Sequence, residues 1–265
     1  YRSGARFGPR HVREQSSLIR PWNSALNVQP FERLRVADCG DVDIVPISIE
    51  DTFAAIERTL GPIVTGGVTP ICVGGDHTIT LALLRVLARR HGRLGLVHFD
   101  SHPDTWDRYF GLPYYHGSTF RRAVEEGLIE GSRSIQVGIR GPLYAPDDFA
   151  FHAAHGFEVL RIQEIKQQGV EWAGGRLARL AGGPVYCSFD IDAVDPAYAP
   201  GTGTPEVGGL TSYEALGLVR ALRPLNLCGA DIVEVSPPYD GPGAITGLLA
   251  ANLLFELVSV LALHV

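Results

Sequence analysis

The chain contains no methionine and only four cysteines among its 265 residues. The cysteines form no CxxC pair, and three of them lie in apolar runs; they are Cys39, Cys72, Cys187 and Cys228. This pattern is not that of a thiolate metal site or a disulfide framework, so we expect buried, reduced thiols in a cytoplasmic protein. Because the chain starts with Tyr1 and has no methionine, we also expect a native N-terminal segment to be missing.

Clusters of basic residues and long uninterrupted apolar runs are lacking as well. The formal net charge is −6, which argues against nucleic acid or a membrane surface as the main partner. No signal peptide is visible, and the most apolar stretch, 248–265, is interrupted by Asn252, Glu256 and Ser259. We therefore expect this stretch to form a packed helix rather than a membrane span.

The composition is typical of a globular protein, with 45% hydrophobic and 20% charged residues. A chain of 265 residues is long enough for one large α/β domain or two small ones. No internal repeat, low-complexity segment or linker divides the sequence. We predict a single domain over residues 1–265.

Short apolar runs alternate with amphipathic segments of helix length. We predict strands over 69–74, 94–100, 134–140, 184–190 and 227–236, with weaker signals at 34–38 and 157–161. We predict helices over 51–66, 78–91, 118–127, 171–181, 211–223 and 246–264. The strand runs are almost continuously apolar, which is typical of parallel strands covered on both faces. The fold class predicted is α/β, a three-layer α/β/α sandwich with a mainly parallel central sheet.

Asp100, His102 and Asp104 occupy alternate positions at the end of one predicted strand. Alternate side chains of extended backbone point the same way, so two carboxylates and an imidazole face one point. Asp190 and Asp192 end another predicted strand in the same manner.

A third group lies at the strand-to-helix turn Gly74-Gly75-Asp76-His77. A phosphate-binding loop is the rival interpretation, but neither GxxxxGK[ST] nor GxGxxG is present. We predict that His77 is a metal ligand and that Asp76 supports it. Since the carboxyl ends of parallel strands form one rim, the three groups should converge there. Four carboxylates in one pocket need cations to offset them, so the sequence predicts a site for two divalent metals.

Three further features lie on loops that follow predicted strands. The Pro- and Gly-rich segment 199–209 predicts a rigid pocket wall, with Asp195 before it as a structural residue. Glu234, in the rigid segment 234–240, is placed either to bind metal or to bind a cationic substrate. His116 is either a simple exposed residue or a proton shuttle, because it follows Asp104 closely in sequence.

The motifs GGDH, DSHPD, SFDIDAVDPAYAPGTGTPEVGGL and DIVEVSPPYD closely resemble the ureohydrolase family of arginase, agmatinase and guanidino-acid hydrolases. The resemblance covers nearly the whole chain. It implies an arginase-like fold, two Mn²⁺ per chain, hydrolysis of a guanidinium group with release of urea, and a homotrimer or homohexamer. Family chains usually begin some tens of residues earlier, which agrees with a missing N-terminal segment.

Matched residue by residue, the resemblance implies six metal ligands, which are His77, Asp100, His102, Asp104, Asp190 and Asp192. It implies that Asp100 and Asp190 bridge the metals, that His116 is the mobile catalytic histidine, and that Glu234 holds the guanidinium. A proton must reach the leaving amine, and Asp104 or His116 could supply or relay it.

Ser101, Pro103 and Trp106 depart from the family pattern. Ser101 and Pro103 are not ligands, so the metal site should survive. Trp106 replaces an Asn that helps arginase-like members bind the amino-acid end of the substrate, and an indole would crowd that end.

The motif wording favours agmatinase, which converts agmatine to putrescine and urea in polyamine biosynthesis. The alternative is a hydrolase of 4-guanidinobutanoate or 3-guanidinopropanoate, with Arg108 or Arg121 binding the substrate carboxylate. Two other functions are a deacetylase on a similar metal-binding fold and a binding module without catalysis. A deacetylase typically uses one metal, whereas the clusters here supply ligands for two, and a binding module would lack some of the six ligands, all of which are present. Both fit the sequence less well.

Overall fold

The computed structural model describes residues 2–265, and its centre is a six-stranded parallel sheet in the order β1-β6-β5-β2-β3-β4. The strands are β1 (Ile71–Val73), β2 (Leu94–Phe99), β3 (Ile129–Ile139), β4 (Glu158–Arg161), β5 (Pro184–Asp190) and β6 (Asn226–Val233). The helices are α1 (Gly8–Ser16), α2 (Pro30–Arg33), α3 (Ile49–Thr65), α4 (Ile79–His91), α5 (Thr119–Glu125), α6 (Ala150–His155), α7 (Ile162–Gln168), α8 (Val170–Leu177), α9 (Ser212–Arg220) and α10 (Ile245–Ala262).

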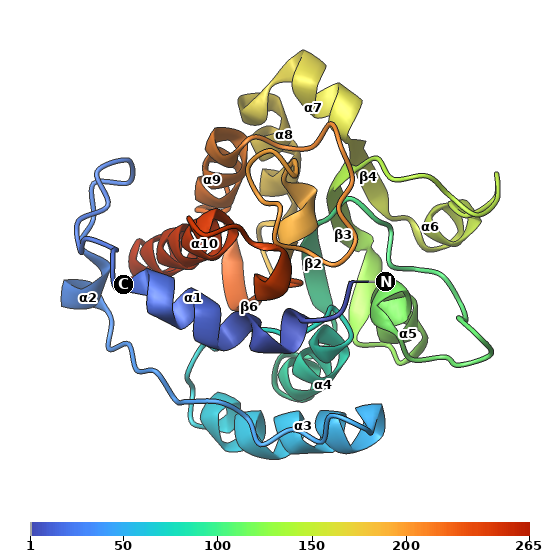
Figure 1. Ribbon diagram of the computed structural model, residues 1–265, viewed down its shortest axis with the longest axis horizontal. Helices are drawn as coiled ribbons and strands as arrows, with labels where there is room; N and C mark the ends of the chain where they lie inside the picture. The colour runs from blue at the N-terminus through green and yellow to red at the C-terminus, as the bar shows by residue number, and fades with distance from the viewer. Residues whose placement is uncertain (1) are drawn as a thin grey trace.

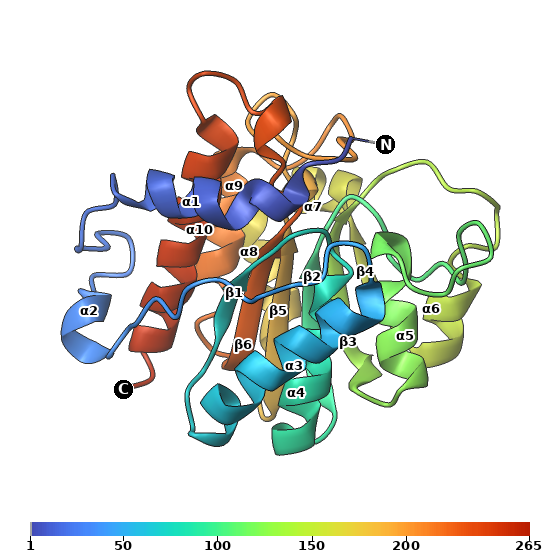
Figure 2. The same cartoon turned by 60° about the horizontal axis from the view of Figure 1, so that its bottom comes forward.

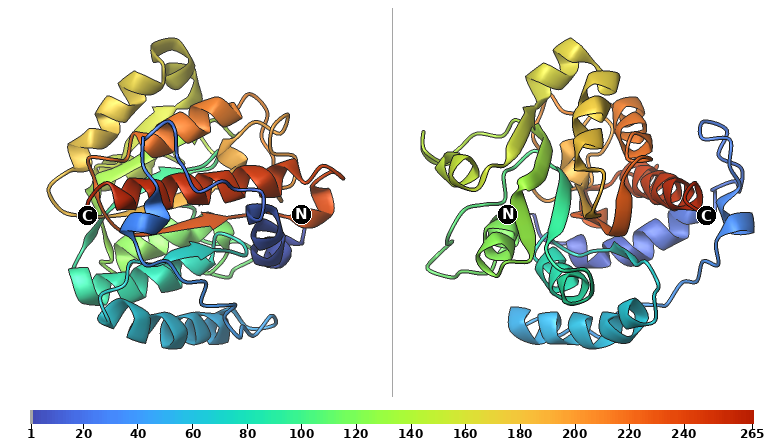
Figure 3. Two further views of the ribbon diagram at one scale, coloured as in Figure 1. Left: turned by 90° about the vertical axis from the view of Figure 1, so that its left-hand side faces the viewer. Right: turned by 180° about the vertical axis from the view of Figure 1, so that it is seen from behind.

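Helices cover both faces of the sheet, with α8, α9 and α10 on one side and α3, α4 and α5 on the other (Figures 1 and 3). Strand β2 shows why. Val97 and Phe99 belong to the core under α8 to α10, whereas Leu94 and Leu96 belong to the core under α3 to α5. Since successive side chains of a strand point to opposite faces, an almost continuous apolar run is what a doubly covered strand requires.

The loops after the strands gather at one end of the sheet, and α1 crosses near the same end (Figure 2). Gly8 at the start of α1 packs so closely that an added Cβ would lie 2.7 Å from the Val235 carbonyl oxygen and 2.9 Å from that of Gly74. The N-terminal helix is therefore fitted against the segments that follow β1 and β6.

The predicted three-layer parallel fold is confirmed, although some element bounds differ. The weak strand predicted at 34–38 is wrong, because these residues have no regular structure and lie largely exposed on the surface. Among residues 2–265 no strand pairs with them, and Asp38 is held instead by Arg13, with 2.7 Å between Oδ2 and Nε. Among the described residues, helices α1, α2, α6 and α7 were not predicted.

Helix α10 is long and apolar enough, by length and composition alone, to cross a membrane, with a mean hydropathy of 1.9 over 18 residues. However, 61% of those residues are buried, and the helix packs against α1 and α9. This agrees with the predicted packed helix.

All four cysteines are free, and their burial falls short of the prediction: Cys187 and Cys228 are buried, Cys72 is partly buried and Cys39 is exposed.

Candidate metal centre

The turn after β1 places His77 at the end of the sheet. Gly74 is required there, because an added Cβ would lie 2.7 Å from Ile79 Cδ1 and 2.9 Å from Val233 Cγ1. The backbone N–H of His77 donates to Glu234 Oε1 at 2.8 Å. The turn after β1 and the segment after β6 therefore hold each other in place.

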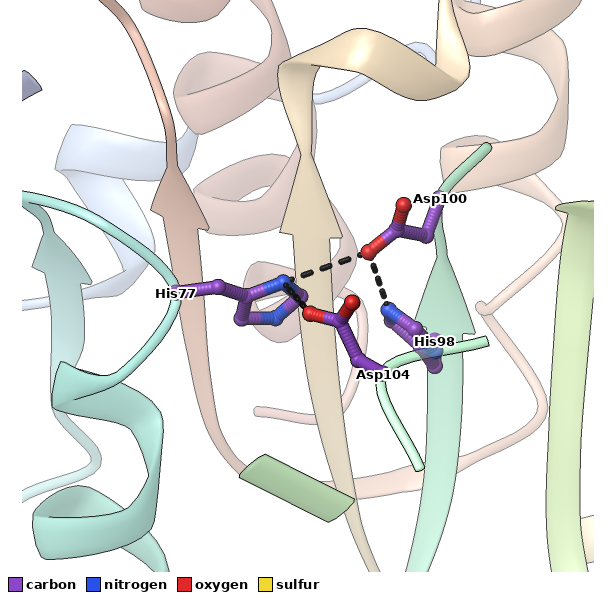
Figure 4. A group of neighbouring side chains, drawn as sticks. All are labelled: His77, His98, Asp100 and Asp104. Carbon is purple, nitrogen blue, oxygen red and sulfur yellow. Dashed lines mark hydrogen bonds and ion pairs between the residues drawn. The ribbon is translucent and has the colours of Figure 1, made fainter. Parts of the chain in front are cut away.

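Three carboxylates surround one nitrogen of His77. Its Nδ1 lies 3.0 Å from Asp104 Oδ2, 3.2 Å from Asp100 Oδ2 and 3.3 Å from Asp190 Oδ2. Figure 4 shows the first two of these contacts. The atom is buried and has no hydrogen-bond partner among residues 2–265. A buried nitrogen that faces three carboxylate oxygens without a hydrogen bond has the geometry of a cation site.

The other ring nitrogen explains which atom of His77 is available to a cation. Ser188 Oγ donates to Asp231 Oδ1 at 2.6 Å, so it accepts from His77 Nε2, which lies 2.8 Å away. Asp231 also accepts from the hydroxyls of Thr80 and Tyr186, both at 2.6 Å. With the proton on Nε2, Nδ1 presents a lone pair to the carboxylates. Hydrogen bonds of this kind orient the histidine ligands of metal sites.

A second group of donors lies next to the first and shares Asp100 with it. His102 Nδ1 lies 3.1 Å from Asp192 Oδ2 and 3.4 Å from Asp100 Oδ1. Asp100 therefore presents Oδ2 to the group around His77 and Oδ1 to the group around His102. Burial alone would lower the pKa of His102, but Asp192 and Asp100 raise it to about 12. Both groups are thus arranged to hold positive charge.

Backbone and hydroxyl donors orient these carboxylates. Asp100 Oδ1 accepts the N–H of His102 at 2.6 Å, and Asp190 Oδ1 accepts the N–H of Asp192 at 2.8 Å. Asp192 Oδ1 accepts from Ser101, from its N–H at 3.0 Å and its hydroxyl at 2.7 Å. Ser101, which departs from the family pattern, therefore orients the predicted ligand Asp192. For Asp190 the contacts place one oxygen in the first group only, and its bridging role stays a prediction.

Two residues of the site have positive φ although they are not glycine. Asp104 has φ +48° and Glu234 has φ +64°. Such conformations cost ~1–3 kcal/mol each and occur where the surrounding structure enforces them, often at functional sites. Here Phe120 N–H donates to Asp104 O at 3.0 Å, and Glu234 N–H donates to Gly75 O at 2.9 Å. Burial, together with Asp76, raises the pKa of Glu234 to about 8.

The loop that carries His116 is anchored to the same region. His116 starts a short 3₁₀ turn, and the Thr119 hydroxyl lies 3.1 Å from the carbonyl oxygens of both His116 and His77. The described contacts of the His116 ring are with Tyr115, and none joins it to the metal donors. His116 thus lies on a loop fixed next to His77, while its predicted proton transfer remains untested.

Trp106 borders a cavity of about 410 Å³ beside the second donor group. Its ring centroid lies 6.4 Å from that of His102, and its Nε1 donates to Asp148 Oδ2 at 2.9 Å. The cavity is lined by Trp106, Asp107, Arg108, Tyr109, Tyr115 and Tyr144. Arg108 therefore lies at this cavity, whereas Arg121 pairs with Glu125 and Asp107.

Sequence reasoning missed His98, which is fully buried on β2. Its Nε2 lies 2.7 Å from Asp100 Oδ2, and it forms one donor cluster with His77, Asp100 and Asp104. The alternation that singled out Asp100 and His102 also includes residue 98, so this signal was present.

Asp195 accepts three backbone N–H groups, which agrees with its predicted structural role.

Comparison with known proteins agrees with this fold. A sequence model of the arginase family matches residues 1–259. The chain belongs to the arginase family and is an enzyme of that family, as its motifs predicted. Two proteins of Pseudomonas aeruginosa are similar to this chain, and each alignment covers 98% of this chain and 82% of the relative. The guanidinopropionase is 50% identical and the guanidinobutyrase is 48% identical. A mitochondrial agmatinase of Gallus gallus is 46% identical over 98% of this chain and 76% of its own.

A solved structure shows the same architecture. The proclavaminate amidino hydrolase of Streptomyces clavuligerus superposes with a TM-score of 0.93 at 38% identity, covering 99% of this chain and 87% of that one. The names of these relatives give different substrates, so the family does not by itself define the substrate.

Proposed function

We propose that the chain hydrolyses the guanidinium group of a linear guanidino acid, such as 3-guanidinopropanoate or 4-guanidinobutanoate, and releases urea. The observation that carries the proposal is the pair of donor groups that share Asp100, together with the cavity that Arg108 and Trp106 line, since the Trp106 ring lies 6.4 Å from that of His102. The identity to a guanidinopropionase and a guanidinobutyrase supports the same substrate class.

We propose that two Mn²⁺ ions occupy the two donor groups. The donor set fits, because four of the six donors are carboxylates, which suit Mn²⁺, and because the buried His77 Nδ1 faces three of them. The six proposed ligands are His77, Asp100, His102, Asp104, Asp190 and Asp192. When bound, the two cations supply Lewis acidity and lower the pKa of water to roughly 7.

The chain's own residues would then bind the substrate and move protons. Glu234 is buried near His77, and its carboxylate would accept hydrogen bonds from the guanidinium N–H groups. In the reaction, water adds to the guanidinium carbon, the bond to the substituted nitrogen breaks, and the amine leaves with an added proton. We propose that Asp104 or His116 delivers that proton.

The far end of the substrate distinguishes the candidate compounds. A guanidino acid presents a carboxylate, and Arg108 lines the cavity with a side chain that is 57% exposed. Agmatine instead presents an ammonium, for which Asp107 in the same cavity is the available partner. Asp107 already pairs with Arg122 and lies 3.6 Å from Arg121, whereas the Arg108 contact to Asp107 is 3.9 Å. Agmatine is accordingly the second candidate.

A urea-release assay on Mn²⁺-loaded protein tests this proposal. The panel is 3-guanidinopropanoate, 4-guanidinobutanoate, agmatine and arginine under one metal condition. The proposal expects one of the two acids to have the highest kcat/KM, whereas agmatine ahead of both acids favours the second candidate. Absence of urea release from all four compounds would refute it.

A homo-oligomer, either a trimer or a hexamer, is a further proposal that rests on the family resemblance, and a cytoplasmic location is one that rests on the cysteine pattern. Light scattering coupled to size-exclusion chromatography tests the first of these. A monomeric mass at micromolar concentration would contradict it.

A further inference from the structure

A row of polar side chains crosses the sheet one level below the metal donors. Asp231 on β6 pairs in register with Ser188 on β5, Ser188 with His98 on β2, and His98 with Gln136 on β3. All four residues are fully buried. At one end of the row, Ser188 and Asp231 orient His77 through its Nε2. The other side, formed by His98 and Gln136, leads to Asp100 and is not used by the proposed reaction.

Gln136 makes hydrogen bonds that define its orientation. Its Nε2 lies 2.7 Å from the carbonyl oxygen of Pro103, which can only accept. The same nitrogen lies 3.0 Å from His98 Nδ1, so the amide donates there as well. Its Oε1 lies 2.7 Å from His152 Nε2 and accepts from it. Burial lowers the pKa of His152 to about 4, so this ring is neutral and uses its single N–H for Gln136.

The orientation of Gln136 determines the tautomer of His98. Because Nδ1 of His98 accepts from the amide, the proton of the neutral ring is on Nε2, which donates to Asp100 Oδ2 at 2.7 Å. Phe120 packs on His98 with ring centroids 4.2 Å apart and on His77 at 5.2 Å. The hydrogen bond to Asp100 is therefore formed between fully buried groups, where such bonds are strong.

Gln136 also holds the loop that carries two other donors. Pro103, whose carbonyl accepts from the amide, lies between His102 and Asp104. Asp104 has the unfavourable φ of +48°, so its position depends on neighbours that hold the chain. The amide of Gln136 thus holds the loop next to Asp104 by its bond to Pro103. Through His98 it also orients Asp100, the carboxylate that both donor groups share.

We propose that Gln136 is a positioning residue of the metal centre, which sets the tautomer of His98 toward Asp100 and holds the His102–Asp104 loop through Pro103. The inference rests on the proposed metal site. It assigns no chemical step to Gln136, whose effect is on the affinity for the cations.

The decisive variant is Gln136→Glu, which keeps the shape but removes both N–H donors. Pro103 O and His98 Nδ1 would each lose their donor, and His98 would no longer be held with its proton toward Asp100. We expect Mn²⁺ affinity, measured by calorimetry on metal-free protein, to fall about 10- to 100-fold, as for other residues that orient ligands. The added negative charge alone would strengthen cation binding, so unchanged or tighter binding would overturn the proposal.

Two variants serve as matched controls. Gln167→Glu makes the same change at an exposed position on α7 and should leave Mn²⁺ affinity unchanged. His152→Phe removes only the donor to Gln136 Oε1 and keeps both amide donors, so its affinity should stay near that of the wild type. A loss in His152→Phe as large as in Gln136→Glu would indicate general damage to the core and would contradict the proposed role.

A measurement on the unaltered chain tests the tautomer without any variant. In ¹⁵N-histidine-labelled protein, His98 should show a protonated Nε2 and an unprotonated Nδ1. The opposite tautomer would refute the inference even if Gln136→Glu failed to fold. Wild-type protein that binds no Mn²⁺ would instead refute the proposed function, so the two failures are distinguishable.

Discussion

His77 Nδ1 lies 3.0 Å from Asp104 Oδ2, yet no hydrogen bond joins the two atoms. The proton of the ring is on the opposite nitrogen, which donates to Ser188. Burial opposes a charge on His77, but the three carboxylates around Nδ1 raise its pKa well above the usual value, so without a cation a second proton would occupy Nδ1. With a cation, the lone pair and the carboxylates are all ligands. This relationship motivates the first predictions.

Protein loaded with Mn²⁺ should contain close to two metal ions per chain, because two donor groups share Asp100. Removal of metal by a chelator should lower Tm, since the carboxylates then repel one another, and a ligand at a hundred times its Kd stabilises a fold by about 2.7 kcal/mol. Elemental analysis and thermal unfolding measure both effects. A stable value of one metal per chain with full activity would contradict the dinuclear arrangement.

His102→Ala should lose metal and activity together, whereas His116→Ala should lose activity while retaining metal. The contrast follows from the position of His102 Nδ1 3.1 Å from Asp192 and from the absence of a described contact between the His116 ring and the donors. Metal content and kcat of the two variants provide the measurement. Equal metal loss in both would show that His116 also supports the centre.

Ser188→Ala should weaken Mn²⁺ binding about 10- to 100-fold and reduce the free energy of unfolding by ~1–3 kcal/mol. The substitution leaves the buried His77 Nε2–H and one Asp231 oxygen without their partner. Ser259→Ala is the matched control, because its buried hydroxyl donates to the carbonyl of Phe255 within α10, away from the metal donors. The prediction fails if both serine variants bind metal equally well.

Arg108→Ala should lower kcat/KM for 3-guanidinopropanoate or 4-guanidinobutanoate about ten- to a hundred-fold and change that for agmatine little. A hydrogen bond to a charged group contributes ~1.5–3 kcal/mol, and only the acids present a carboxylate to this cavity. Arg89→Ala, an exposed position on α4 paired with Glu57, is the control. Parallel losses for acid and amine substrates would exclude Arg108 as the carboxylate partner.

Arginine should be a poor substrate. The indole N–H of Trp106 donates to Asp148, and the ring lines the cavity at the position where the family resemblance places the amino-acid end of arginine. An unpaired polar group costs ~1–3 kcal/mol when buried, which corresponds to roughly ten- to a hundred-fold in kcat/KM. Direct comparison of the four compounds provides the test, and arginine equal to the best of them would contradict this role of Trp106.

Local rules were sufficient to predict much of the fold and of the site. Continuous apolar runs identified the doubly covered strands, because this pattern depends only on neighbours along the chain. Alternation singled out Asp100, His102 and Asp104, but the chain is not extended there: it bends after β2, and Asp104 has φ +48°. Asp100 and Asp104 meet at His77 and His102 lies against Asp192, so tertiary contacts place these side chains. The same rules failed at 34–38, which has strand-like composition but pairs with no strand in the described part of the chain. They also missed α6, although this helix carries His152.

By itself, the sequence determined the parallel α/β fold and the donor residues at the ends of the strands. Only the tertiary structure decided which oxygen of Asp100 faces which group and which nitrogen of His77 is free for a cation. It also decided that Gln136 would lie beside His98, from which it is 38 positions away. Register between strands and the directions of buried hydrogen bonds depend on partners from distant parts of the chain. Residue type and local spacing do not encode them.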